Sequence, residues 1–269
     1  MKTKTTQNED RPAHARGTDD GRQVALFVTC LVDLFRPSIA FAAVRLLEQS
    51  GFTVVVPKQG CCGQPNYNGG DRAGAATMAL QTIRIFGAFE YVVAPSGSCA
   101  AMIRCHYPKL FETGSAARRE AEALASRTFE LTTFLTDIAG VSTSSATLQG
   151  AATYHDACAG LRELNIKQQP RELLGAVAGL TLSDMPDTEA CCGFGGMFCV
   201  KYPELSIRIA EQKIADVEKT AADYLIGGDL GCLMHLEGKL HRDGKAVRVL
   251  HVAEVLAGVT DGDPQDADV

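Results

Sequence analysis

The 269-residue chain contains the motif Cys-Cys-Gly twice, at residues 61–63 and 191–193. One further cysteine precedes each motif and another follows it, so the order of cysteines in the first half recurs in the second. The repeated set is Cys30, Cys61, Cys62 and Cys99, followed by Cys158, Cys191, Cys192 and Cys232. Matched cysteines are separated by 128 (30 to 158), 130 (61 to 191) and 133 residues (99 to 232). Such a nearly constant spacing indicates an internal duplication.

The ends of the two halves are also alike, because residues 129–135 (FELTTFL) correspond to residues 250–256 (LHVAEVL). Between the halves, residues 140–150 are rich in Ser, Thr and Gly, a composition typical of a linker. The parts expected in order are a disordered leader (1–21), a first Cys-Cys-Gly domain (22–140), a second Cys-Cys-Gly domain (151–260) and an acidic tail (261–269).

Short apolar runs alternate with longer amphipathic patterns in both halves, which predicts strands separated by helices in an α/β fold. The predicted strands are 24–29, 53–56, 91–94, 152–155, 180–182 and 224–226, and the predicted helices are 38–49, 73–86 and 203–219. In the last helix, an apolar stripe of Leu205, Ile209, Ala210, Ile214 and Val217 is expected to face the core. The expected architecture is two pseudo-symmetric, Rossmann-like domains.

Composition indicates where in the cell the protein is expected to lie and which classes of partner are excluded. The net charge of -6 and the absence of a basic stripe argue against nucleic-acid binding. The start of the chain lacks the apolar core of a secretory signal, and the apolar run at 24–35 is too short for a membrane span. We therefore expect a cytoplasmic protein.

Ten cysteines in a reducing compartment favour metal binding or thiol chemistry over structural disulfides. Cys30, Cys99 and Cys158 lie at or just after predicted strand ends, and both Cys-Cys-Gly turns lie in loops before a helix. Sites in open α/β sheets gather beyond the carboxyl ends of strands. Four clustered thiolates need a cation, and thiolates select iron-sulfur clusters, zinc or copper(I). Iron-sulfur centres are the leading interpretation, with zinc in at least one half, thiol chemistry or plain packing as alternatives. Cys105 and Cys199 have no matched partner and are expected to be structural.

Four segments closely resemble the lactate-utilization protein A family: TCLVDLF (29–35), CCGQPNYNG (61–69), CCGFGG (191–196) and GCLMH (231–235). The resemblance covers residues 23–258. It extends to other Cys-Cys-Gly proteins, including the Cys-Cys-Gly subunit of heterodisulfide reductase and the iron-sulfur subunit of glycolate oxidase. It implies an iron-sulfur electron-transfer component that serves the oxidation of L-lactate to pyruvate. The implied partners are a ferredoxin-like iron-sulfur protein B and a third protein C.

The chain departs from the heterodisulfide reductase pattern, in which each repeat ends in Cys-x-x-Cys and supplies five cysteines to a noncubane cluster. Met102 and His235 stand at that last position here. His235 could be a fifth ligand, although a surface or locally hydrogen-bonded histidine is the simpler interpretation, and Met102 is expected to pack in the core. Four cysteines per half remain, which is enough for an ordinary four-iron cluster. The alternatives are a zinc-stabilised scaffold in the same complex, or an iron-sulfur subunit acting on glycolate or a heterodisulfide.

Other polar residues are candidates for supporting roles. His155 and Asp156 precede Cys158 and could orient a metal ligand or carry a proton, although a locally hydrogen-bonded histidine at a strand end is the simpler interpretation. A supporting role beside the ligands is expected. Arg104 and Arg162 could bind a substrate carboxylate, although a solvated helix face is the simpler interpretation. No catalytic residue is assigned from the sequence.

Overall fold

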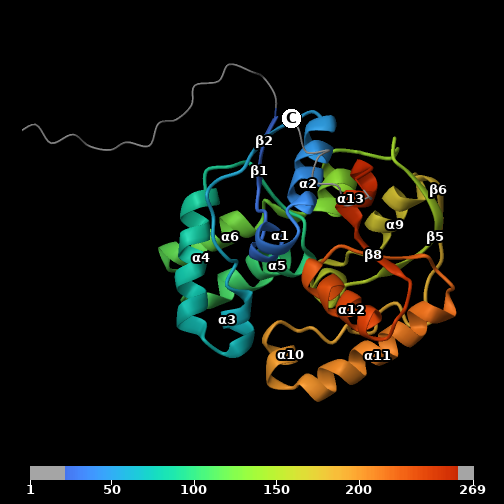
Figure 1. Cartoon of the computed structure of the whole chain (residues 1–269). Helices are drawn as coiled ribbons and strands as arrows, with labels where there is room; N and C mark the ends of the chain where they lie inside the picture. The colour runs from blue at the N-terminus through green and yellow to red at the C-terminus, as the bar shows by residue number, and fades with distance from the viewer. Residues whose placement is uncertain (1–21, 260–269) are drawn as a thin grey trace, which may run out of the picture.

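The computed structural model describes residues 22–259, and the predicted leader (1–21) and the predicted acidic tail (261–269) lie outside this range. Two four-stranded parallel sheets form the framework (Figure 1). The strands of the first sheet are β1 (Arg22–Leu26), β2 (Phe52–Val55), β3 (Tyr91–Ala94) and β4 (Thr128–Glu130), in the order β2-β1-β3-β4. Those of the second are β5 (Thr147–His155), β6 (Ala178–Leu182), β7 (Tyr224–Gly227) and β8 (Arg248–His251), in the order β6-β5-β7-β8. The second order repeats the first, so the α/β fold and the duplication predicted from the sequence are confirmed.

Helices connect the strands in both halves. Those of the first half are α1 (Cys30–Phe35), α2 (Ser38–Gln49), α3 (Gln64–Gly69), α4 (Arg72–Phe86), α5 (Gly97–Ala101), α6 (Ala116–Ala125) and α7 (Leu131–Thr133), with π-helical turns at Met102–His106 and Phe134–Ile138 and a 3₁₀ turn at Tyr107–Leu110. Those of the second are α8 (Cys158–Leu164), α9 (Gln168–Gly175), α10 (Met197–Lys201), α11 (Pro203–Lys219), α12 (Leu230–Arg242) and α13 (Val252–Ala257). Within residues 22–259, no helix has both the length and the apolar character needed to cross a membrane.

All six predicted strands are present; β3 has the predicted bounds, and the other five begin or end at different residues. The strand predicted over 24–29 ends at Leu26, and β5 begins at Thr147, inside the segment expected to be a linker. Strands β4 and β8 were not predicted as strands, although both lie in the segments recognised as similar between the halves.

The predicted inward stripe of α11 is wrong at Leu205, which is 54% exposed. The buried position is taken by Ser206, whose hydroxyl donates a hydrogen bond of 2.8 Å to the carbonyl oxygen of Gly193. With Ser206 facing the core, the preceding residue, Leu205, faces outward. The stripe resumes with Ala210, Ile214 and Val217, which are buried.

One hydrophobic core runs through both halves. It contains buried residues of β1 and α2 in the first half and of α12 and α13 in the second. A smaller core in the first half contains buried residues of α4 and α6. Helices α2 and α13 pack side by side across the boundary (Figure 1). The same boundary carries the ion pair between Arg36 and Glu254, with Nε and Oε1 2.9 Å apart. The halves are therefore fixed to each other by apolar packing and by a partly buried charge pair.

Candidate metal centres

The four repeated cysteines of the first half converge beyond the carboxyl ends of β1 and β3. Cys30 begins α1, Cys99 lies in α5, and Cys61 and Cys62 occupy the loop between β2 and α3. The sulfur atoms of Cys62 and Cys99 are 3.4 Å apart. The Cys61 sulfur accepts hydrogen bonds from the thiols of Cys30 and Cys62. A continuous chain of sulfur contacts therefore joins all four residues.

The second half repeats this arrangement. Cys158 begins α8, Cys232 lies in α12, and Cys191 and Cys192 occupy the loop between β6 and α10. The Cys191 sulfur accepts hydrogen bonds from Cys158 and Cys192, and the Cys192 side chain also contacts Cys232. The eight cysteines singled out by spacing thus form two matching sets of four.

The glycine after each cysteine pair gives the loop its shape. Gly63 and Gly193 have φ of 83° and 91°, in the left-handed region that side chains with a Cβ disfavour. In this conformation each glycine amide donates to the first cysteine of its pair, at 3.4 Å from the Cys61 sulfur and 3.3 Å from the Cys191 sulfur. The turn therefore directs the backbone toward the sulfur atoms and stabilises negative charge there.

Hydrogen bonding distributes the charge unevenly within each set. Hydrogen bonds from Cys30 and then Cys62 lower the pKa of Cys61, while the bond to Cys61 is the largest cause of the raised pKa values of its two neighbours. In the second half, Cys191 is the residue with the lowered pKa, for the same reason. Four thiols so close together share their protons, and a soft metal cation would allow all of them to become thiolate ligands.

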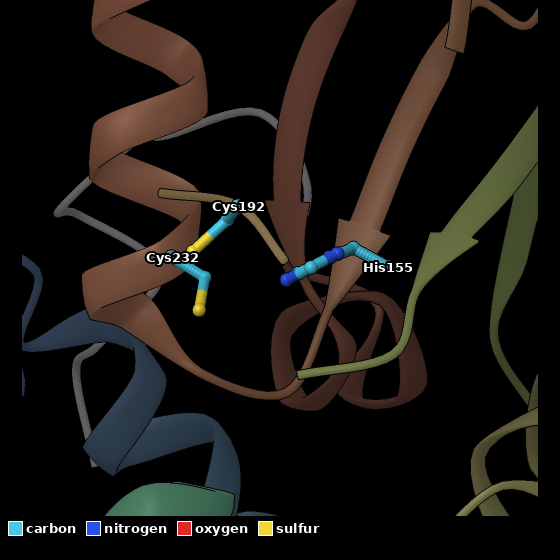
Figure 2. Close-up of side chains that lie close together, drawn as sticks. All are labelled: His155, Cys192 and Cys232. Carbon is cyan, nitrogen blue, oxygen red and sulfur yellow. The ribbon is translucent and has the colours of Figure 1, made fainter. Parts of the chain in front are cut away.

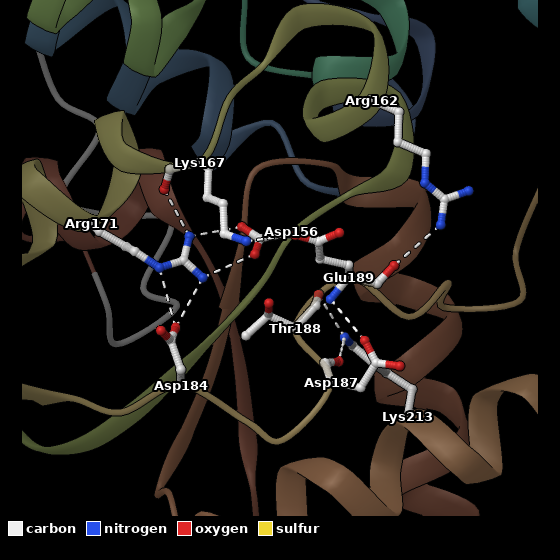
Figure 3. A network of polar contacts seen from close by, with 9 residues as sticks. All are labelled: Asp156, Arg162, Lys167, Arg171, Asp184, Asp187, Thr188, Glu189 and Lys213. Carbon is white, nitrogen blue, oxygen red and sulfur yellow. Dashed lines mark hydrogen bonds and ion pairs between the residues drawn. The ribbon is translucent and has the colours of Figure 1, made fainter.

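A polar network holds the loop that leads to the second cysteine pair (Figure 3). The ammonium group of Lys213, which is fully buried, donates to the carbonyl oxygens of Asp187 and Thr188 at 2.8 and 2.9 Å. Glu189 accepts from Lys167 through its carboxylate at 2.6 Å and from Arg162 through its carbonyl at 3.3 Å. Arg162, a candidate substrate-binding residue, therefore anchors this loop.

The same network reaches the end of β5. Arg171 donates to both carboxylate oxygens of Asp156, at 2.8 and 2.9 Å, and also to Asp184. Because Asp156 directly follows His155, this bidentate pair fixes the backbone at the entrance to α8. Asp156 thus has a positioning role in this structure.

The helices that carry the cysteines meet at the boundary between the halves. Asp229, directly before α12, accepts hydrogen bonds from the Ser98 amide at 2.9 Å and the Ser96 hydroxyl at 3.1 Å. Helices α5 and α8 approach so closely that a Cβ on Gly97 would lie 3.0 Å from the Cα of Gly160. The boundary therefore links the start of the Cys99 helix to the starts of the Cys158 and Cys232 helices.

His155 emerges from the structure as a site residue. Its ring lies among the second set, where one of its nitrogens and the sulfur atoms of Cys192 and Cys232 are within 4.8 Å of one another (Figure 2). His235, the other histidine considered, instead has its Nε2 3.2 Å from the hydroxyl of Ser206.

The other residues considered from the sequence lie away from the two sets of four cysteines or contact groups other than those cysteines. Arg104 donates to the carbonyl of Thr128 at 2.6 Å and, with Cys105, lines a surface cavity of about 580 Å³. The Cys199 thiol contacts the carbonyl of Gly196 at 3.1 Å. Met102 is fully buried in the core of the first half.

Comparison with known proteins defines the class first. Residues 24–104 and 152–237 each match the cysteine-rich domain CCG, so the molecule is a protein of two such domains. Lactate utilization protein A of Geobacillus kaustophilus (strain HTA426) is 47% identical over 235 residues, covering 87% of this chain and 98% of that protein. Lactate utilization protein A 2 of Bacillus cereus (strain AH820) is 44% identical over 236 residues, with the same coverage. The chain belongs to the lactate utilization protein A family.

A crystal structure of a hypothetical protein from Helicobacter pylori has a similar fold, with a TM-score of 0.61 and 12% sequence identity. The alignment covers 91% of this chain and 50% of that one. At this level of identity the similarity concerns the fold alone.

Proposed function

We propose that this chain is an iron-sulfur electron-transfer component of a system that oxidises L-lactate to pyruvate. Each half holds one centre through its four repeated cysteines, and the clusters are of the four-iron type. The observation that carries the proposal is the pair of matching four-sulfur sets, because four cysteine ligands are what an ordinary four-iron cluster requires. When bound, such a cluster supplies one-electron redox chemistry.

The arrangement of the donors supports a cluster over zinc. Structural zinc sites commonly use pairs of cysteines separated by two to four residues, whereas each set here combines an adjacent pair with two distant cysteines. In both sets the second cysteine of the pair and the last cysteine are buried, while the other two are half-buried. A centre held in this way would be protected on one side and close to the surface on the other, which suits electron exchange with a partner.

The lactate-utilization role rests on the family relationship. Oxidation of lactate to pyruvate removes two electrons and two protons, and two one-electron centres in one chain can accept those electrons singly. We further propose that the lactate site belongs to a partner, with an iron-sulfur protein B and a protein C as the other components. All ten cysteines are free thiols in the structure, which fits a cytoplasmic location.

Anaerobic purification followed by metal and acid-labile sulfide analysis tests the proposal. We expect iron and sulfide in equal amounts, and a paramagnetic signal that appears on reduction and disappears on reoxidation. Stoichiometric zinc without labile sulfide would instead favour a zinc-stabilised scaffold subunit. Reduction of the loaded protein by a glycolate- or thiol-dependent partner, but not by a lactate-dependent one, would reassign the substrate.

A further inference from the structure

His155 ends strand β5 as a buried histidine without a protein partner. Its side chain is 1% exposed, and both ring nitrogens lack a hydrogen-bond partner among the described residues. Leaving a buried polar atom unpaired destabilises the fold, and most such atoms in folded proteins do have a partner. The imidazole is therefore placed for a group other than the side chains and backbone around it.

The His155 ring points toward two cysteine sulfur atoms of the second set, which indicates that the missing partner is a metal centre. Figure 2 shows the imidazole directed toward the sulfur atoms of Cys192 and Cys232, with these three donors within 4.8 Å of one another. The next residue, Asp156, is held by Arg171 and does not contact the ring through any described hydrogen bond. The nitrogen and the two sulfur atoms could therefore bind the same metal centre.

The first half provides an internal comparison. His155 lies three residues before Cys158, and Phe27 lies three residues before Cys30. Phe27 is fully buried and packs on Phe86 with ring centroids 5.4 Å apart. This position is therefore apolar in one half and carries a nitrogen donor in the other, although the four cysteines are repeated.

The other buried histidine, His251, lacks a partner only for its Nε2. His251 uses its Nδ1 to accept a hydrogen bond of 3.2 Å from the Ala253 amide. Among the buried histidines of the described chain, His155 alone lacks partners for both nitrogens. Unlike His251, which caps a helix, His155 makes no hydrogen bond within the described chain that explains its burial.

We propose that His155 is a metal ligand of the second centre, which makes the donor set of that half four cysteines and one histidine, one donor more than an ordinary four-iron cluster takes. The first centre is held by cysteines only. This inference rests on the proposed function, since it assumes that the second set binds an iron-sulfur centre. A neutral imidazole adds a donor without adding negative charge, so the two centres differ in their ligand chemistry.

Pulsed paramagnetic resonance of the reduced protein, labelled with ¹⁵N-histidine, tests the proposal directly. The protein carries Cys61→Ser and Cys62→Ser, so that the signal comes from the second centre. We expect a strong hyperfine coupling to a directly bound nitrogen, which changes on labelling and is lost in His155→Phe. The matched control, His235→Phe, keeps it. His155→Phe is expected to fold because phenylalanine occupies the matching position in the other half.

A second variant, His155→Cys, distinguishes loss of the nitrogen ligand from loss of the fold. In His155→Cys, a thiolate can replace the imidazole, so we expect iron and sulfide to be retained while the nitrogen coupling disappears. A coupling that persists in His155→Phe and His155→Cys, or a cluster signal without any bound nitrogen, would overturn the assignment of His155. Absence of iron and sulfide from the wild-type protein as well would contradict the proposed function itself.

Discussion

The two cysteine sets share their sulfur contacts but differ in the way their loops are held. In the first half, Gln59 bridges the loop to the sheet: it accepts from the Val28 amide at 3.0 Å and donates to the Leu26 carbonyl at 3.1 Å. In the second half, the buried Lys213 and a set of ion pairs hold a longer loop. The duplication has therefore kept the candidate ligands and changed the residues that support them.

A second difference lies where the last strand of each sheet meets a helix. Glu130 begins α7 by accepting hydrogen bonds from the amides of Thr132 and Thr133, whereas His251 begins α13 by accepting from Ala253. An acid and a base thus occupy equivalent capping positions. Both are buried, so each is favoured in its neutral form, with opposite consequences for the dependence of stability on pH.

The largest expected difference in stability is between alanine variants of Gly63 and Gly193, the glycines of the two Cys-Cys-Gly motifs. A Cβ on Gly193 would lie 2.5 Å from the Ser206 carbonyl oxygen, whereas a Cβ on Gly63 would lie 3.2 Å from the Met78 Cβ. Both variants suffer the left-handed backbone penalty of about 1–2 kcal/mol, but Gly193→Ala also clashes with the backbone of α11. We expect Gly193→Ala to lower the free energy of unfolding by about 3–4 kcal/mol and Gly63→Ala by about 1–2 kcal/mol. Denaturant unfolding measures both, and equal losses would contradict the described packing.

The pH dependence separates the two capping residues. Burial raises the pKa of Glu130 from 4.5 to about 7, so its contribution to stability is present below about pH 4.5 and lost as the pH rises to about 7. Burial lowers the pKa of His251 from 6.5 to about 4, so its contribution is present above pH 6.5 and lost as the pH falls to about 4. In the shared range the two effects oppose each other.

Single substitutions should therefore expose each effect. Relative to the wild type, Glu130→Gln should gain about 3 kcal/mol of stability as the pH rises from 4.5 to about 7. His251→Asn should gain about 3 kcal/mol as the pH falls from 6.5 to about 4. Unfolding free energies measured across this pH range provide the check. Curves parallel to that of the wild type would show that these groups are not neutral in the folded protein.

The smallest expected difference in stability is between variants of Lys213 and Gln59, the residues that hold the loops before the two cysteine pairs. Lys213→Met removes the buried donor of the carbonyls of Asp187 and Thr188, and we expect a loss of about 2 kcal/mol. Gln59→Leu removes hydrogen bonds from a half-buried site, for which we expect about 1 kcal/mol. Limited proteolysis should also show faster cleavage within residues 183–190 of Lys213→Met. An equal or larger loss for Gln59→Leu would contradict the greater role assigned to Lys213.

The two sets of four cysteines could be proposed from the sequence because the order and spacing of the cysteines repeat, which can be read without knowing any contact. The α/β fold was predicted because short apolar runs and amphipathic segments alternate along the chain, which is a local signal. The short strands β4 and β8 were missed because their apolar residues run directly into helices at Leu131 and Val252. Leu205 was wrongly placed because the inward position of Ser206 depends on a contact with Gly193, which lies 13 residues away.

The position of His155 required the structure, because a ring without partners can be recognised only when its neighbours are known. A signal was nevertheless present in the repeat, since the offset of 128 residues aligns His155 with Phe27. A polar residue in one copy at an apolar position of the other indicates a local change of role. The loop network around Lys213 had no comparable signal, because its acceptors are backbone carbonyls.

The central claim is that each half holds its own iron-sulfur centre. Its most direct test is iron and labile-sulfide analysis of three proteins purified anaerobically: wild type, Cys61→Ser with Cys62→Ser, and Cys191→Ser with Cys192→Ser. We predict that each double variant retains about half of the wild-type iron and sulfide, with a distinct reduced-state spectrum in each case. Loss of all iron from either variant, or no loss from one of them, would contradict the account of two separate centres.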